Sequence, residues 1–91
     1  IVEGDATDPW VIERVLRNVD HLVYAAGNLF PGATILETGS AAGELPPLLA
    51  VLDGLRRHPG ATLTFISSGG AVYGIPEPLP VADAHPTNPI N

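Results

Sequence analysis

Two short apolar segments, residues 21–27 and 62–66, restrict most strongly what this chain can fold into. The first shows no clean alternation of apolar and polar residues, which is typical of a strand covered on both faces in a parallel sheet. The second is predicted to be another buried strand. Because parallel strands need a crossover connection, which is usually helical, the chain is expected to place a helix between them.

A helix is predicted before each of these strands. Asp8 can cap the first helix, and Pro9 suits its first position. Apolar residues then recur at helical spacing, with Glu13 and Arg17 paired on the opposite face, so we expect a helix that ends near Asn18. The apolar positions are Val11, Ile12, Val15, Leu16 and Val19.

The second helix is predicted from a leucine stripe, which consists of Leu45, Leu48, Leu49, Leu52 and Leu55. Its prolines are confined to the first turn, and Pro-Gly at residues 59–60 ends it. Residues 28–42 are predicted to be a long loop with one irregular turn, and residues 71–73 a short ordered turn within the last loop. Trp10 and Phe65 are expected in the core.

With a strand stub at residues 1–2, the predicted order is strand, helix, strand, loop, helix, strand. This alternation is typical of an α/β protein with a right-handed, doubly wound parallel sheet, in which ligands bind beyond the carboxyl ends of the strands. Each predicted strand ends in small or polar residues, at residues 4–5, 25–28 and 67–70. We expect these clusters on one rim, where small side chains let a flat ligand approach the backbone.

The charge balance limits the classes of partner that the chain is expected to bind. Ten acidic residues against four basic ones give a net charge of −6, so the chain lacks the basic surface that a nucleic acid or an anionic membrane requires. No apolar run approaches the roughly 20 residues that span a bilayer, and a cytoplasmic location is the default expectation. The three histidines are solitary and cysteine is absent, so no metal site is expected.

The strand-end segments also carry a family resemblance. Residues 4–8 (Gly-Asp-Ala-Thr-Asp), 23–27 (Val-Tyr-Ala-Ala-Gly) and 65–74 (Phe-Ile-Ser-Ser-Gly-Gly-Ala-Val-Tyr-Gly) resemble, in this order, the extended short-chain dehydrogenase/reductases. More narrowly, they resemble the NAD-dependent epimerase/dehydratase branch, which works on nucleotide sugars. Residues 80–91, with Asp83 before a Pro-Thr-Asn-Pro run, strengthen the match, so that the resemblance covers essentially all of the chain.

The resemblance implies a partial Rossmann-like doubly wound parallel sheet that binds NAD. Position by position, Asp5 would accept a hydrogen bond from the adenine amino group, and Ala6 would give a backbone contact beside it. The small residues after the first full strand would line the dinucleotide near its pyrophosphate and ribose. These are Ala25, Ala26 and Gly27.

The resemblance also implies a Ser or Thr hydroxyl that hydrogen-bonds the substrate hydroxyl undergoing oxidation. The slots in which the family's pattern places it are occupied here by Gly69 and Ala71. Ser68 is the nearest candidate and is predicted to be the catalytic donor, with Ser67 as a packing or cofactor contact. Tyr73 is predicted to anchor its loop. The family's general base, a Tyr whose pKa a Lys lowers, would come just after the last residue of this chain.

The expected function is reversible hydride transfer by an NAD-dependent nucleotide-sugar epimerase or dehydratase, with a nucleotide sugar as substrate and a homodimer as the assembly. Residues 1–91 are expected to be the central part of a single NAD-binding Rossmann domain, truncated at both ends and inactive by itself. Two alternatives remain open. One is a non-catalytic dinucleotide-binding or regulatory relative, which Gly69 and Ala71 favour, and the other is a flavodoxin-like binding module.

Overall fold

The computed structural model describes residues 1–27, 36–77 and 79–90. In chain order its elements are α1 (Pro9–Leu16), β1 (His21–Tyr24), the 3-10 helix η1 (Thr38–Gly43), α3 (Leu45–Arg57), β2 (Thr62–Phe65) and α4 (Gly69–Tyr73). The order of helix, strand, helix and strand agrees with the prediction. The first part of the predicted long loop, residues 28–35, lies outside the described residues.

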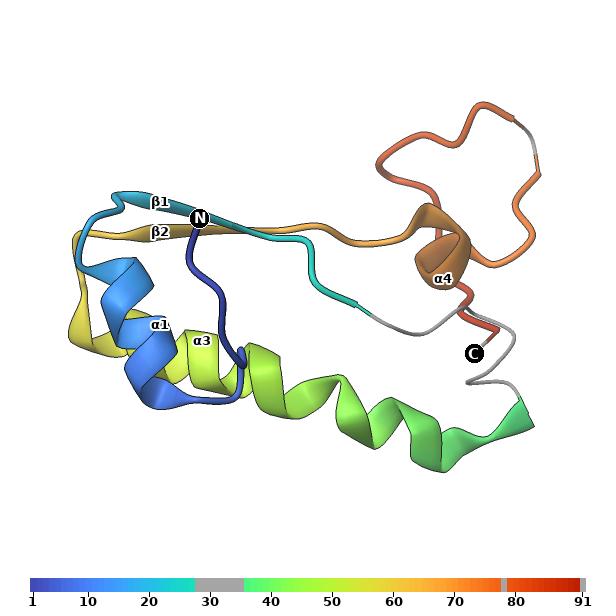
Figure 1. Ribbon diagram of the computed structural model, residues 1–91. Helices are drawn as coiled ribbons and strands as arrows, with labels where there is room; N and C mark the ends of the chain where they lie inside the picture. The colour runs from blue at the N-terminus through green and yellow to red at the C-terminus, as the bar shows by residue number, and fades with distance from the viewer. Residues whose placement is uncertain (28–35, 78, 91) are drawn as a thin grey trace.

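The two strands lie side by side as a parallel pair (Figure 1). His21 is opposite Thr62, and Tyr24 is opposite Phe65. The pairing continues beyond β2, since the N–H of Ile66 donates a hydrogen bond to the carbonyl of Tyr24 at 3.0 Å. A parallel neighbour can be reached only through a crossover, which α3 provides. The predicted α/β class with a parallel sheet is therefore confirmed.

α1 and α3 contact each other and cover the same face of the strand pair (Figure 1). The buried core is formed by Ile12 and Leu16 of α1, Tyr24 of β1 and Val51 of α3. Gly54 allows the two helices to approach closely, because a Cβ at this position would lie 2.6 Å from Cγ2 of Ile12. The small core is thus enclosed between two helices and one face of the sheet.

The helix boundaries follow signals in the sequence. α1 begins after Asp8, whose Oδ1 accepts a hydrogen bond from the backbone N–H of Trp10 at 2.9 Å, and Pro9 occupies the first turn. The helix ends at Leu16, slightly before the predicted end. α3 has its prolines in the first turn and ends before residues 59–60, as predicted.

Two predictions about the core are wrong. Trp10 is 79% exposed, because it lies about 200° around the helix from Ile12 and therefore faces away from the buried side of α1. Phe65 is 52% exposed, although its ring stacks on that of Tyr24 with 5.8 Å between the ring centroids. Each aromatic side chain thus keeps at least half of its surface outside the core.

The buried face of α3 also differs from the predicted leucine stripe. Val51 and Gly54 are buried on this face, and Leu48 and Leu55 pack against the core. The other leucines of the stripe are exposed, namely Leu45, Leu49 and Leu52. The helix is turned so that the side with Val51 faces the core. Leu45 lies about 120° around the helix axis from Val51 and therefore faces away from the core.

The opposite face of the strand pair is open within the described residues, where it is formed by His21, Val23, Thr62 and Thr64, all exposed. The expectation that β1 is covered on both faces is therefore not met in this part of the chain.

Residues 1–2 form no strand and are exposed, so the predicted stub has no partner among the described residues. No helix in the described ranges is long and apolar enough to cross a membrane.

Candidate functional site

Small residues follow both strands at the same edge of the sheet. Ala25, Ala26 and Gly27 follow β1, and Ser67 and Ser68 follow β2, and all five are exposed. α4 and the chain after it lie beyond this edge (Figure 1). The parallel pairing therefore brings two of the three predicted clusters to one rim, which is where ligands bind in open α/β sheets.

The third predicted cluster, Gly4 and Asp5, is held by a helix and not by a strand. A Cβ on Gly4 would lie 2.7 Å from Cγ2 of Val11, so this glycine packs directly on α1. Because residues 1–2 form no strand, the described pairing does not place Asp5 on the rim.

The Asp5 carboxylate is fixed in a tight turn. Its Oδ1 accepts hydrogen bonds from the backbone N–H of Thr7 at 2.8 Å and from the Thr7 hydroxyl at 2.7 Å. These two bonds hold the pKa of Asp5 below its ordinary value, so the carboxylate is ionised at neutral pH. Within the described residues Oδ2 accepts no hydrogen bond and is available to an outside donor. Ala6 beside it is half-buried.

Glu44 also borders the end of β1 and is not among the site residues predicted from the sequence. A Cβ on Gly27 would lie 3.4 Å from Oε2 of Glu44, which directly precedes α3. A signal for this contact exists in the sequence. The crossover after a parallel strand starts at the carboxyl edge, so a residue directly before a helix predicted to begin at Leu45 is expected near that edge.

At the end of β2, Ser68 is the N-cap residue of α4, since its Oγ accepts a hydrogen bond from the backbone N–H of Ala71 at 3.4 Å. Ser67 makes no hydrogen bond through its side chain within the described residues. Both serines line a hollow of about 280 Å³, which is completed by Gly69, Val72 and Tyr73. Because capping uses a lone pair of Oγ, the Ser68 hydroxyl can still donate its proton.

Tyr73 and Gly74 hold the chain that follows α4. The Tyr73 ring lies edge-on to the imidazole of His85, with 5.7 Å between ring centroids, and the N–H of Asn88 donates to the carbonyl of Val72 at 3.0 Å. Gly74 has φ of 68°, and a Cβ at this position would overlap the carbonyl oxygen of Asn88. The ring contact agrees with the predicted anchoring role of Tyr73.

The groups at the rim suit a flat ligand with hydrogen-bonding groups. Backbone and methyl surfaces after β1 allow a flat ligand to approach closely, and exposed hydroxyls after β2 can donate or accept hydrogen bonds. No three His, Cys, Asp or Glu side chains come together as metal ligands in the described part of the chain. The available chemistry is therefore hydrogen bonding by hydroxyl, carboxylate and backbone groups.

Known relatives match the chain from end to end. A Methanocaldococcus jannaschii protein whose name assigns it to the UDP-glucose 4-epimerases is 46% identical over 93 residues, which cover 99% of this chain and 30% of that protein. UDP-glucose 4-epimerase of Azospirillum brasilense is 32% identical over 98 residues, which cover all of this chain and 27% of that enzyme. The chain thus spans less than a third of the length of these relatives. No protein-family model matches it.

A solved structure shares the fold. The crystal structure of UDP-glucose 4-epimerase from Bifidobacterium longum, in complex with NAD+ and UDP, aligns with a TM-score of 0.80 and 29% sequence identity. The alignment covers 94% of this chain and 26% of that one. Together with the sequence relatives, this match confirms the predicted Rossmann-like fold and the resemblance to the NAD-dependent epimerase family.

Proposed function

We propose that the protein carrying this chain, a relative of the NAD-dependent epimerases, is itself an NAD-dependent nucleotide-sugar epimerase. Residues 1–91 would form the central part of its single NAD-binding Rossmann domain. The observation that carries the proposal is the end-to-end match to proteins named as UDP-glucose 4-epimerases, which runs through every predicted strand-end cluster. By the same match, the proposed substrate is a sugar linked to uridine diphosphate.

The described residues fit NAD. A cofactor that lies across the ends of the strands must approach the backbone closely, and the small residues Ala25, Ala26 and Gly27 allow this approach. Asp5 is ionised and has a carboxylate oxygen free to accept a hydrogen bond from the adenine amino group, with Ala6 beside it. Ser67 has an unused hydroxyl at the rim. We assign these residues to the cofactor.

NAD, when bound, supplies a reversible acceptor for hydride from a sugar carbon. The role of this chain in that reaction is to orient the reacting groups. Ser68 Oγ accepts a hydrogen bond from Ala71 and still has a proton to donate, so it can hold a substrate hydroxyl at the hollow after β2. We therefore assign Ser68 as the hydroxyl that hydrogen-bonds the reacting oxygen.

A second candidate function is a dinucleotide-binding protein of the same fold without catalysis. The observation that favours it is the lack of a side-chain hydroxyl at Gly69 and Ala71, together with the capping bond that already engages Ser68. In both functions the protein binds NAD, but only the epimerase converts a substrate.

Purified full-length protein distinguishes the two candidates. We expect tightly bound NAD in the protein, detected after heat release, and conversion of UDP-galactose to UDP-glucose. Bound NAD without conversion of any UDP-sugar would favour the non-catalytic candidate, and absence of NAD binding would contradict both. The 91-residue chain alone is expected to be inactive. A homodimer and a cytoplasmic location stay predictions.

A further inference from the structure

One face of α1 gathers a tryptophan and three charged residues at helical spacing. Trp10, Glu13, Arg14 and Arg17 are at positions i, i+3, i+4 and i+7 and so lie on the same side of the helix, away from the buried Ile12. The Trp10 side chain is 79% exposed, whereas tryptophan is highly buried on average. An aromatic side chain of this size held in solvent marks a surface that differs from an ordinary exposed helix face.

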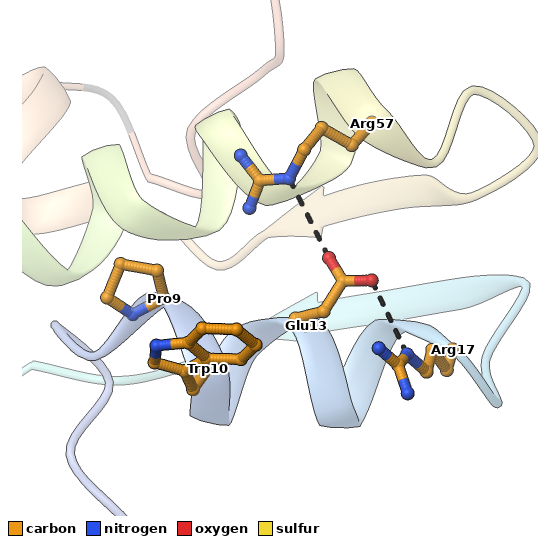
Figure 2. A pocket seen from close by; sticks show the side chains of 5 residues that line it. All are labelled: Pro9, Trp10, Glu13, Arg17 and Arg57. Carbon is orange, nitrogen blue, oxygen red and sulfur yellow. Dashed lines mark hydrogen bonds and ion pairs between the residues drawn. The ribbon is translucent and has the colours of Figure 1, made fainter.

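The surface around Trp10 is hollowed on two sides. One hollow of about 370 Å³ lies between α1 and α3 and is lined by Pro9, Trp10, Glu13, Arg17 and Arg57, the last of which belongs to α3. Figure 2 shows Glu13 lying between the side chains of Arg17 and Arg57. A second hollow of about 340 Å³ is lined by Trp10, Glu13 and Arg17 together with Val11 and Arg14. We call the two adjoining hollows the tryptophan–arginine groove.

Positive charge exceeds negative charge in this groove. The carboxylate of Glu13 is shared by Arg17 at 3.5 Å, Arg57 at 3.7 Å and His58 at 3.1 Å. In each pair the guanidinium nitrogen at this distance is Nε, and the Arg17 and Arg57 side chains are 65% and 52% exposed. Arg14 has no partner within the described residues. Three arginines and one glutamate therefore line the groove.

This excess stands out because the chain as a whole is acidic. Its net charge is −6, and all four of its basic residues are arginines, in or directly after α1 and in the last turn of α3. Tryptophan and arginine, with tyrosine, are enriched among the side chains that dominate the energy of protein interfaces, and arginine binds carboxylates through paired N–H donors. The groove thus combines a flat apolar platform with unused donors for acidic groups.

We propose that the tryptophan–arginine groove is a docking surface for an acidic segment of another protein. The segment carries an aromatic side chain that packs on Trp10, and its carboxylates bind Arg14, Arg17 and Arg57. Charge complementarity and the exposed indole support this occupant. The surface is independent of the proposed cofactor site, since no residue at the strand ends lines either hollow.

The test uses full-length protein and fluorescence anisotropy. The probe is a short fluorescein-labelled peptide of glutamate and serine with adjacent phenylalanines at its centre. We expect binding that weakens with added salt, and an increase in Kd of about tenfold in Trp10→Ala and in Arg17→Gln. Arg56→Gln is the matched control, because it removes the same charge from α3 at a residue that pairs with Asp53 and lines neither hollow.

The control variant and a control peptide distinguish docking in the groove from general charge attraction. Support requires that Arg56→Gln change Kd by less than about twofold and that a peptide with serine in place of phenylalanine bind more weakly. Equal weakening by Arg56→Gln would show general charge attraction and overturn the proposal. Absence of peptide binding would also overturn it, as would self-association of the protein through Trp10, which would identify a second copy of the protein as the occupant.

Discussion

Gly54 of α3 lies so close to Ile12 of α1 that a Cβ on the glycine would be 2.6 Å from Cγ2 of the isoleucine and 2.7 Å from Cδ1 of Leu16. Alanine is a better helix former than glycine by about 1 kcal/mol, but overpacking of a core costs about 1–3 kcal/mol. Because Cγ2 of a β-branched side chain cannot move away easily, we expect Gly54→Ala to lower the free energy of unfolding by about 1 kcal/mol. Urea unfolding of the full-length protein measures this change.

The control for this substitution is Gly43→Ala in η1, where nothing lies within 4 Å of the added methyl group. We expect it to leave stability unchanged or slightly increased. If Gly54→Ala stabilised the protein as much as a glycine-to-alanine substitution at an exposed helical position does, this result would contradict the close approach of α1 and α3.

Gly74 is expected to tolerate no side chain. Its φ of 68° is unfavourable for residues with a Cβ by about 1–3 kcal/mol, and the Cβ would also overlap the carbonyl oxygen of Asn88. Gly74→Ala should therefore release the chain after α4 and break the hydrogen bond from Asn88 to Val72. Faster hydrogen exchange of the Asn88 amide would report this release, with Gly60→Ala as a control at an uncrowded glycine. Unchanged exchange would contradict it.

Ser68→Ala separates a capping role from a catalytic one. Loss of the cap alone is expected to cost about 0.5–2 kcal/mol of stability and to leave kcat unchanged. If the hydroxyl also binds the reacting oxygen, kcat should fall by about tenfold or more beyond any loss of stability. The comparison is Ser67→Ala, which removes an adjacent hydroxyl that caps no helix. Equal kcat for Ser68→Ala and the unmodified protein would remove Ser68 from the catalytic site.

Local signals predicted most of the fold. The cap at Asp8 and the Pro-Gly pair at residues 59–60 act within a few residues, and so both helices appear close to where the sequence places them. The apolar runs similarly identified β1 and β2. These features depend on the chain's own backbone chemistry and on short-range hydrogen bonds.

Contacts between elements were less accessible to sequence reasoning. Spacing shows that Leu48 and Leu49 belong to one stripe, but the rotation of α3 against α1 buries Val51 and leaves Leu49 exposed. The rotation goes with the close approach of the two helices at Gly54. Helix propensity alone identifies this glycine only as an unfavourable residue in a helix. At the site, Glu44 approaches Gly27 from the far end of the crossover, and its position directly before the predicted helix was the only signal in the sequence for this proximity.

The pKa of Glu13 predicts a pH-dependent contribution to stability. A hydrogen bond from His58 is the main cause of its lowered pKa, and the charge of His58 and the contact with Arg17 act in the same direction, against partial desolvation. A carboxyl group with a lowered pKa in the folded state stabilises the protein above its unfolded pKa, about 4.3, and loses this contribution as the pH falls through the folded value.

Glu13→Gln should therefore lower the unfolding temperature at neutral pH, with a difference from the unmodified protein that shrinks toward about pH 3. Thermal unfolding across this range measures the effect. Glu3→Gln is the control, since Glu3 is exposed and has no partner within the described residues. A difference that stayed constant with pH would show that the packing of the side chain matters and its charge does not.

Asp5→Asn tests whether the carboxylate serves the cofactor or only its own turn. The amide oxygen of Asn can accept both hydrogen bonds from Thr7 and keep the turn, but its NH2 group then replaces Oδ2, the oxygen that is free to accept. We expect a small loss of stability at neutral pH, because the lowered pKa of Asp5 means that its ionised form stabilises the fold, and an affinity for NAD lowered by about tenfold or more, measured by calorimetry on protein stripped of cofactor. Thr7→Ala is the matched variant, because it removes one donor of the turn and leaves Oδ2 in place. If Asp5→Asn bound NAD as well as the unmodified protein while Thr7→Ala bound it poorly, the turn and not the carboxylate would be what the cofactor requires.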